Sequence, residues 1–442
     1  MHKDILNIWD FFLMILYLLL IYIIFFLIKG NNIKEHPEYK YLLPALSIKI
    51  FGAITFSLVY IFYYGGGDTI NYFTSGEILS NYLFKDPNQY FKLLFSSTNF
   101  SNDLAHIRHE IFYAKSAEEW FMVKIISVIN IFSFNRYIIS SLLMSLISLW
   151  GAWRLFQSFL LFNPKHIKIM FYAVFFTPSV IFWGSGILKD TISLSFISLF
   201  FYYSIKLFFI YQIRIKSIII LIISALVVFT MKAYILLSFL PVVLLGWIAY
   251  NRSTISNQLF RNLIMPIILI AIIYAGFILL PEIADQSEKY KIENLESRMV
   301  GFHMWHTLVG GSSYDLHVTD YSFWGIIKKI PASLNVTFYR PYLTEIRNAS
   351  MAIGGFESTI YLIFSLFLLF QYRLKIISKI YKNPLLLMAF LYSILLGFAV
   401  GFTSYNFGAL ARYKIPVMPF FVYILLSLYS EYKADKRLKN GG

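Results

Sequence analysis

Long apolar runs, separated by short basic connections, dominate the sequence. A transmembrane α-helix needs about twenty mostly apolar residues to cross a hydrocarbon core of ~30 Å. The stretches that approach this length run over about 8–28, 44–64, 137–160, 167–187, 190–211, 216–231, 234–250, 262–280, 351–371, 384–402 and 413–430. Open sheets cannot satisfy their backbone groups in lipid, so these spans are expected to be helices. The pattern predicts an all-α integral membrane protein, a polytopic bundle of about 11–12 transmembrane helices.

Two features of the apolar pattern need a separate interpretation. The piece 120–134 is short and carries Lys124, so it is either a short span or a helix that lies along the membrane interface. The first run is longer than the apolar core of a cleaved signal peptide, and no small-residue cleavage site follows it. We therefore expect the first run to be retained as a span.

The basic connections predict the orientation of the chain, because short cytoplasmic loops are rich in Lys and Arg. The basic stretches are Asn163–Lys168, Gln212–Lys216, Arg252–Arg261, Gln371–Lys382 and Lys433–Lys439. With the C-terminus cytoplasmic, alternate crossing puts the long polar segments 65–119 and 281–350 outside, provided that 120–134 does not cross. The N-terminus is then external too. We expect one transmembrane domain, 1–442, with two large external loops, in the cytoplasmic (inner) membrane.

Composition supports this class and excludes others. The chain is 58% hydrophobic and 14% charged, with a mean hydropathy of +0.66, whereas soluble domains are near half apolar and a quarter charged. The net charge of +15 therefore indicates membrane lipid headgroups as partners, not nucleic acid. The absence of cysteine excludes disulfides and thiolate chemistry. The sequence has no Walker loop and no GxSxG motif, which argues against ATP-driven transport and serine hydrolysis.

The first candidate site is the stretch "GGGDTINYF", which follows the second predicted span. Three glycines allow a sharp turn, and Asp68 then begins a segment with a helix-compatible pattern. Asp68 is either the N-cap of that helix or a general base or sugar ligand at the membrane surface. Tyr72 in the same stretch is a secondary candidate for substrate binding.

The second candidate site is "TPSVIFWGSGILKDTISLSF", where a proline is expected to kink an apolar run. Lys189 and Asp190 are either solvated residues of a hairpin turn, or Lys189 binds a phosphate and Asp190 contributes to the substrate site. Lys232 interrupts another apolar stretch. It either reaches the lipid headgroups or binds phosphate as well.

The third candidate site is "FYRPYLTEIRNASMAIGGFES", where Arg340, Glu345, Arg347 and Glu357 cluster near the start of a span. Glu357 lies inside the predicted span. An Arg–Glu pair in a bundle is either purely structural, or Arg340 binds a phosphate or pyrophosphate with its planar guanidinium. In the second case Glu345 and Glu357 are candidate catalytic acids, and Tyr339 is a secondary substrate-binding candidate.

The fourth candidate site is "ARYKIPVMP", where cations and prolines meet at the start of the last predicted span. Irregular backbone inside a membrane is tolerated where it lines a cavity. Arg412 and Lys414 are candidate phosphate ligands there, and Tyr413 is a secondary candidate for substrate binding. The alternative is a kinked helix end whose cations reach the headgroups.

The metal signal is weak. His303 and His306 are three residues apart, a spacing that suits a metal on a helix, but no third ligand lies near them in sequence. We therefore expect no metal site and no cofactor.

Taken together, these four stretches resemble segments of bacterial polytopic glycosyltransferases and oligosaccharide repeat-unit (exopolysaccharide) polymerases of the GT-C-like superfamily. The resemblance implies a GT-C-like fold. It also implies a glycan carried on polyprenyl phosphate or pyrophosphate as the substrate, used at the external membrane face without a nucleotide sugar. By this resemblance Asp68 matches the acid that activates the acceptor, and Arg340 and Arg412 match arginines that bind the pyrophosphate. Other polysaccharide-assembly proteins are then expected partners.

One departure from the GT-C pattern bears on Asp68. The acid follows the second span, not the first, and stands alone instead of in an acidic pair. Two other functions stay open: a secondary transporter or flippase of a lipid-linked glycan, and a non-catalytic subunit or acyl- or phospho-transferase of envelope assembly. Transporters often show repeated halves, and we find no repeat.

Overall fold

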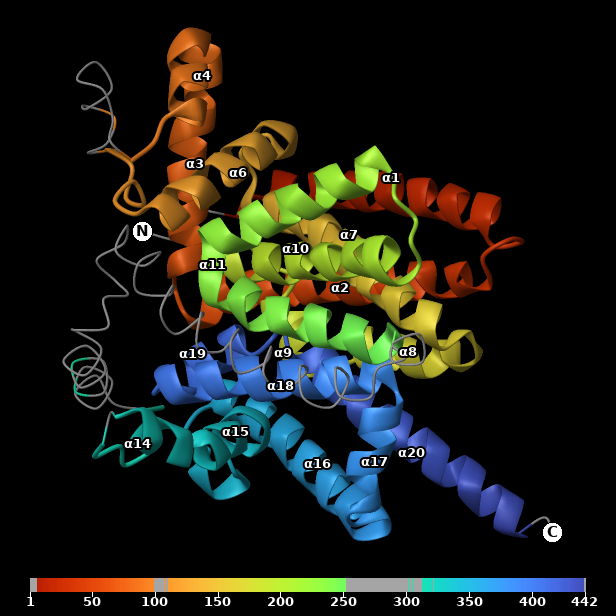
Figure 1. Ribbon diagram of the computed structural model, residues 1–442. Helices are drawn as coiled ribbons and strands as arrows, with labels where there is room; N and C mark the ends of the chain where they lie inside the picture. Colours follow the sequence, from red (N-terminus) through yellow and green to blue (C-terminus); the bar gives the residue numbers. More distant parts are fainter. Residues whose placement is uncertain are drawn as a thin grey trace. The chain divides into compact units, whose positions relative to one another are not determined.

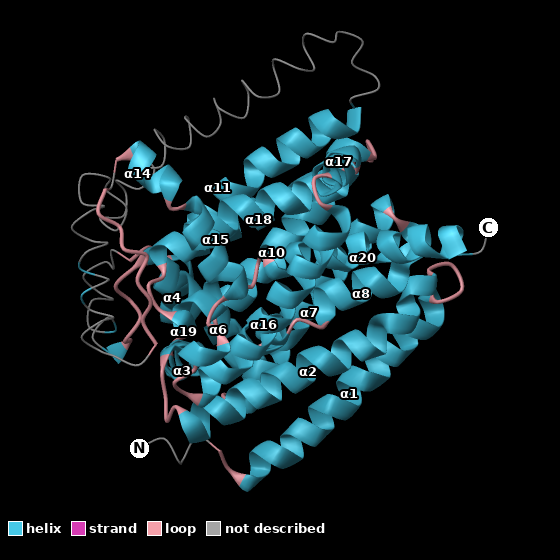
Figure 2. Cartoon of the chain, turned by 90° about the horizontal axis from the view of Figure 1, so that it is seen from below, coloured by secondary structure: helices cyan, strands magenta, loops and turns pink. Residues whose placement is uncertain are grey.

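The computed structural model describes residues 6–98, 107, 110–251, 301, 304, 312–320 and 322–440. These residues are almost entirely helical, as Figures 1 and 2 show, and the only strand-like pairing among them is a bridge between Ser313 and Asn406. The α-helices are α1 (Ile8–Asn32), α2 (Leu42–Leu58), α3 (Asp68–Lys85), α4 (Pro87–Phe95), α6 (Ala117–Ser133), α7 (Tyr137–Phe162), α8 (Ile167–Phe175), α9 (Pro178–Trp183), α10 (Lys189–Ser204), α11 (Ile215–Tyr250), α14 (Phe323–Lys328), α15 (Ile330–Tyr339), α16 (Ala349–Tyr372), α17 (Lys375–Lys382), α18 (Pro384–Thr403), α19 (Phe407–Tyr413) and α20 (Met418–Asn440).

The chain is a multi-pass helical membrane protein. Among the described residues, seven helices are long and apolar enough to cross a membrane, or eight if the bent pair α19 and α20 is one span. With the bent pair counted, the eight spans are three fewer than the eleven predicted runs, for three reasons. The predicted span 262–280 lies outside the described residues, the span 167–187 is broken, and two predicted spans are joined in α11.

The predicted span 167–187 is broken, where the sequence predicted a kink. The chain forms α8, leaves the helical conformation at Phe176 and Thr177, and resumes as the short helix α9. Pro178 explains the break, because a proline disfavours helical backbone at the residue before it and has no N–H to donate.

Helix α11 contains a break at the predicted boundary between two spans. Its 36 residues correspond to roughly 54 Å of helix, which exceeds the ~30 Å hydrocarbon core. Lys232 has φ −157° and ψ 81°, so its backbone is extended and separates two helical stretches. The break agrees with the predicted spans 216–231 and 234–250.

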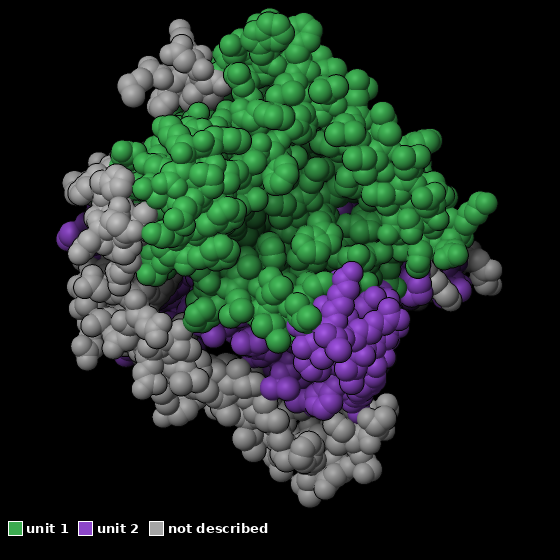
Figure 3. Space-filling view, turned by 90° about the horizontal axis from the view of Figure 1, so that it is seen from above, with its two compact units in different colours: residues 1–160, 180–202, 219–233 green, residues 161–179, 203–218, 234–442 purple. Residues whose placement is uncertain are grey.

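The described residues belong to two compact units, which Figure 3 shows in green and purple. Unit 1 comprises 1–160, 180–202 and 219–233, and unit 2 comprises 161–179, 203–218 and 234–442. The single transmembrane domain remains a prediction.

Unit 1 contains the first polar segment, which is itself partly helical. Helix α3 packs along α6, and Gly76 makes this approach possible because an added Cβ would lie 2.7 Å from the side chain of Ile126. Small residues also bring α7 and α10 together, where a Cβ on Gly151 would lie 2.4 Å from Ser195. The helix that begins at Asp68 was predicted, whereas α4 was not.

Unit 2 contains α15 packed against α18. Thr337 donates a 2.6 Å hydrogen bond to the carbonyl of Gly397, and Gly401 packs on the backbone of Ser333. The predicted last span, 413–430, instead begins at Met418, after a bend of 75° between α19 and α20. The bend contains Pro416, which cannot continue a helix hydrogen-bond ladder.

Candidate functional site

The turn before Asp68 requires its glycines. Gly65, Gly66 and Gly67 all have positive φ, at 65°, 142° and 116°, a region that glycine alone enters at little cost. Gly67 holds the N-cap position of α3, and Asp68 is the first residue of the helix. The N-cap interpretation of Asp68 is therefore wrong, because the glycine turn already occupies that position.

A tyrosine from a distant part of unit 1 holds the carboxylate of Asp68. Tyr113 Oη donates a hydrogen bond of 2.9 Å to Asp68 Oδ1. The Tyr113 ring stacks on Tyr72 with a centroid distance of 4.4 Å and an interplanar angle of 27°. Burial and the neighbouring Asp68 charge raise the pKa of Tyr113, so its phenol remains the donor. Tyr72 is 2% exposed and supports Tyr113, and its role in substrate binding remains a prediction.

Asp190 and Lys232 form a buried ion pair within unit 1. Their side chains are 2% and 9% exposed. Asp190 is thus not a solvated turn residue, and Lys232 does not reach the headgroups. Both interpretations are wrong, because the break in α11 turns the Lys232 ammonium toward Asp190 at the start of α10. Lys189, the first residue of α10, is half-buried.

Sequence reasoning missed Lys49 on α2. Its side chain is 1% exposed, and Lys49 Nζ donates to the carbonyl of Gly184 over 3.2 Å. Ser148 Oγ donates to the same carbonyl at 2.5 Å. Burying a lysine ammonium inside a membrane protein costs free energy, and a hydrogen bond to a neutral backbone carbonyl offsets less of that cost than a carboxylate would. The only sequence signal was a single lysine within an apolar run.

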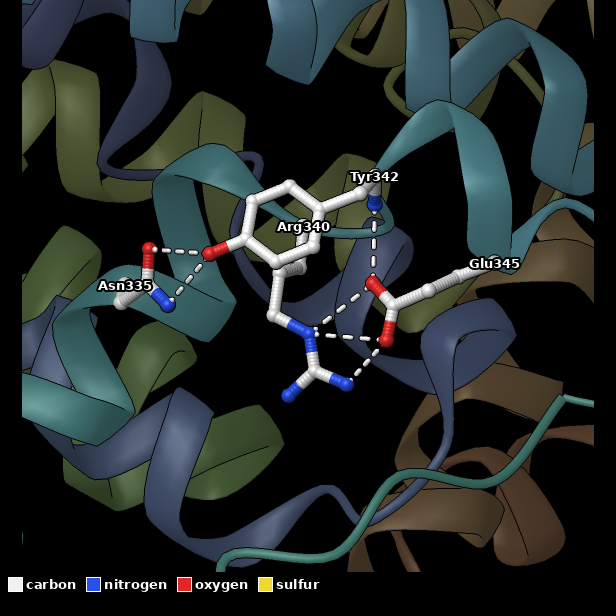
Figure 4. Close-up of polar contacts among 4 residues, drawn as sticks. All are labelled: Asn335, Arg340, Tyr342 and Glu345. Carbon is white, nitrogen blue, oxygen red and sulfur yellow. Dashed lines mark hydrogen bonds and ion pairs between the residues drawn. The ribbon is translucent and has the colours of Figure 1, made fainter.

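In unit 2, Arg340 and Glu345 form an ion pair (Figure 4). The sequence predicted an Arg–Glu pair in this cluster but did not assign its members. Arg340 Nε lies 2.9 and 3.1 Å from the two carboxylate oxygens of Glu345, and Arg340 Nη2 also contacts Glu345 Oε1. The backbone N–H of Tyr342 donates to Glu345 Oε2 at 2.8 Å. The carboxylate is therefore fixed on both sides.

Three aromatic rings surround the guanidinium of Arg340. Its carbon lies 5.9 Å from the ring centre of Tyr314, 5.8 Å from that of Tyr342 and 5.5 Å from that of Phe407. Tyr314 is itself fixed, because its hydroxyl donates to the carbonyl of Gly401 at 2.8 Å. The third nitrogen, Nη1, points away from Glu345 and has no hydrogen-bond partner among the described residues (Figure 4).

The contact between Arg340 and Glu345 shifts the pKa of both side chains toward their charged forms. The hydrogen bonds that Arg340 donates to Glu345 raise the pKa of Arg340, against the effect of burial. Burial alone would raise the pKa of Glu345, but the hydrogen bonds from Arg340 and the backbone of Tyr342 outweigh it, so that this pKa is lowered. Both groups are charged at neutral pH.

Glu357 and Lys414 form a second buried group in unit 2. Glu357 accepts hydrogen bonds from the backbone N–H and the hydroxyl of Ser179, at 2.7 and 2.9 Å. Lys414 Nζ lies 3.9 Å from Glu357 and donates to the carbonyl of Thr337 at 3.1 Å. Lys414 is 3% exposed, so the alternative in which it reaches the headgroups is wrong: the bend before α20 directs it inward.

The remaining predicted residues are less enclosed. Arg412 and Tyr413 end α19 and are half-buried, and Tyr339 Oη donates to Ser365 at 3.1 Å. No group of three His, Asp or Glu side chains that could hold a metal occurs in the described part of the chain. His303 and His306 lie outside the described residues.

Six of the twelve predicted residues thus form three pairs, each within one unit. Unit 1 holds Asp68, Tyr72, Lys189, Asp190 and Lys232, and unit 2 holds Tyr339, Arg340, Glu345, Glu357, Arg412, Tyr413 and Lys414. The structure brings together Asp190 with Lys232, Arg340 with Glu345, and Glu357 with Lys414.

Comparison with models of protein families, with curated proteins and with solved structures found no match to this chain. The functional argument therefore rests on the chemistry of these residues.

Proposed function

We propose that this protein is an integral membrane glycosyltransferase or polymerase of the GT-C-like type. It would transfer a sugar or oligosaccharide from a polyprenyl phosphate or pyrophosphate carrier at the external membrane face, in the assembly of a cell-surface glycan. A multi-pass helical protein suits this substrate, because the carrier has a phosphate at headgroup level and its tail in the bilayer. The membrane architecture supports the proposal but does not distinguish it from transport.

The observation that carries the proposal is the arrangement of Arg340. Its guanidinium is held by Glu345 and by three aromatic rings, while the Nη1 edge points away from the carboxylate. A fixed guanidinium loses little freedom when it binds a phosphate oxygen. We assign Arg340 and Arg412 to the phosphate of the leaving carrier, and Glu345 to the orientation of Arg340.

Asp68 is the proposed base. An acceptor hydroxyl would lose its proton to the Asp68 carboxylate as its oxygen bonds to the anomeric carbon of the donor sugar. The bond from that carbon to the carrier phosphate breaks, and the electron pair leaves with the phosphate. The arginines stabilise the charge that develops on this leaving group.

The test is a set of single substitutions, Asp68→Asn, Arg340→Ala and Arg412→Ala, with glycan products measured in cells at matched expression. We expect Asp68→Asn to reduce product at least about a hundredfold, the scale of a lost general base. The matched control is Arg437→Ala, at an exposed position on α20, which should leave product unchanged. Normal product in all three site variants would contradict the proposal.

A second candidate function is transport of the same class of lipid-linked glycan. The buried pairs Asp190–Lys232 and Glu357–Lys414, each at a break or bend in a helix, favour it, since transporters place ionisable residues at broken helices. Under this function the Asp68→Asn variant would keep product formation. Loss of either pair would instead leave lipid-linked substrate on the cytoplasmic side.

A further inference from the structure

Helix α17 is a short helix between two candidate spans of unit 2. Helix α16 ends at Tyr372 and α18 begins at Pro384, and both are long and apolar enough to cross a membrane. A segment that joins two adjacent spans within about ten residues lies at the boundary between the bilayer and water. Helix α17 is therefore at headgroup level.

One face of this segment is apolar and exposed. Leu374, Ile377 and Tyr381 are 82%, 64% and 44% exposed, and their spacing of three and four residues places them on one side of a helix. Ile380, one turn after Ile377, is buried in unit 2 and marks the edge of the exposed stripe. In water such an exposed apolar stripe is unfavourable, whereas at a membrane surface it inserts between lipids.

The same segment carries only positive charge. Four basic residues and no acid lie between Gln371 and Asn383. Arg373, Lys375 and Lys382 are exposed and have no ion-pair partner among the described residues. They flank the apolar stripe, which is the arrangement of an amphipathic helix that binds anionic lipid.

The fourth cation faces inward and ties this segment to the end of α20. Lys379 Nζ lies 2.8 Å from Glu431 and 3.5 Å from Asp435, and 4.9 Å from the ring centre of Tyr372. These acids neutralise Lys379 and leave the outward cations uncompensated. Lys379 therefore attaches α17 to the end of α20, and the other basic residues and the apolar stripe are exposed on its surface.

We propose that Leu374, Ile377 and Tyr381, together with Arg373, Lys375 and Lys382, form a docking surface for anionic phospholipid. The three apolar side chains insert among the acyl chains, and the three cations contact the lipid phosphates. A soluble acidic protein would satisfy the cations but would have to cover an apolar stripe that already lies at the bilayer boundary. The docking surface fixes α17 and, through Lys379, the end of α20 at the membrane. It does not depend on the proposed sugar transfer.

Depth in the membrane is the first test. Because the chain has no cysteine, Ile377→Cys gives a single labelling site for an environment-sensitive fluorophore in the full-length protein. In vesicles of phosphatidylcholine and phosphatidylglycerol we expect quenching by brominated lipids and protection from aqueous iodide. Lys115→Cys, exposed in the first polar segment, should be quenched less by brominated lipid. Free access of iodide to Ile377→Cys would overturn the proposal.

Lipid selectivity is the second test. Native mass spectrometry of the full-length protein would count retained phosphatidylglycerol against phosphatidylcholine. Lys375→Gln with Lys382→Gln should lower the preference for phosphatidylglycerol by about fivefold for each charge removed. The matched control is Lys85→Gln with Lys115→Gln, both exposed and in unit 1, with the same change in charge.

The result that overturns the charge part of the proposal is an unchanged lipid preference in the α17 double variant, or an equal loss in the control. An acidic partner protein as the true occupant would also give an unchanged lipid preference. Because all four substituted lysines are exposed, we expect both variants to keep the thermal unfolding temperature of the wild type. Wild-type thermal unfolding thus establishes that any loss of selectivity reflects charge and not misfolding.

Discussion

At the scale of single residues, the hydroxyl of Tyr113 is the simplest test of how Asp68 is oriented. Tyr113→Phe removes the hydrogen bond to Asp68 Oδ1 but keeps the ring that stacks on Tyr72. A hydrogen bond to a charged group contributes roughly 1.5–3 kcal/mol. If Asp68 is the base, product formation should fall about tenfold or more when it is compared at equal amounts of folded protein.

The control for this prediction is Tyr82→Phe, the same change on α3. Product should be unaffected there. If Tyr113→Phe makes wild-type amounts of product while Asp68→Asn makes none, Asp68 is functional but does not need Tyr113. If Asp68→Asn is also active, the assignment of the base itself fails.

The Arg340–Glu345 pair predicts a dependence of stability on pH. The hydrogen bonds from Arg340 lower the pKa of Glu345 below its ordinary value despite partial burial. A lowered pKa in the folded state means that the pair stabilises the protein above the unfolded-state pKa of about 4.3 and loses this effect as pH falls below it. The unfolding temperature of the wild type should therefore exceed that of Glu345→Gln at neutral pH, and the difference should shrink in acid. A difference that is constant with pH would show that the ion pair is not its source.

The separation of residues along the chain decided which pairs the sequence could predict. Arg340 and Glu345 are five residues apart, so the sequence placed both in the cluster where an Arg–Glu pair was expected. Asp190 and Lys232 are 42 apart, and Ser179 and Glu357 are 178 apart. Those contacts depend on how helices pack, which periodicity does not specify. Lys49 was missed because hydropathy does not show which face of a span is buried.

At the scale of elements, the break in α11 coincides with one buried ion pair. Lys232 has extended backbone inside the helix and a buried ammonium on Asp190. Removing one partner of a buried pair leaves an uncompensated charge and costs about 3–5 kcal/mol, whereas removing both is often nearly neutral.

We therefore expect Asp190→Asn or Lys232→Met alone to lower the free energy of unfolding by about 3 kcal/mol or more. The double variant should recover much of this loss. The measurement is a double-mutant cycle in mixed micelles. Additive losses in the double variant would mean that the two residues stabilise the protein through separate contacts.

The helices themselves were largely predictable from the sequence, and the exceptions have local causes. Hydropathy marked α1, α7, α16 and α18 because their length and apolar content are those of a span. Pro178 indicated a kink in 167–187. The sequence did not show that the helix breaks fully and resumes as the separate helix α9, because a proline is compatible with either a kink or a break. Helix α4 lies in a polar segment, where hydropathy carries no signal for a helix.

At the scale of the whole molecule, the sides on which the polar segments lie depend on the number of crossings between them. From 65–119 to the C-terminus the sequence predicts nine spans, an odd number, so these two parts should lie on opposite faces. The broken segment α8–α9 is one of the nine, and its helices are short, with 9 and 6 residues. If this segment returned to the side from which it entered, eight crossings would remain, and the two parts would lie on the same face.

The basic stretches Asn163–Lys168 and Gln212–Lys216 favour a crossing. Both are expected on the cytoplasmic side, which requires that α8–α9 and α10 both cross between them. We therefore expect Lys85→Cys, in the first polar segment, and Lys436→Cys, near the end of α20, to react with a membrane-impermeant maleimide from opposite faces. The chain has no native cysteine, so each variant reports a single site. In intact cells Lys85→Cys should be labelled and Lys436→Cys should be labelled only after permeabilisation.

If both variants or neither are labelled in intact cells, the number of crossings between the two positions is even. The first explanation to test is then that α8–α9 is a re-entrant segment. The proposed role of Asp68 as base requires that Asp68 is external. Because Asp68 and Lys85 belong to the same helix, α3, the face on which Lys85→Cys is labelled would then decide this point.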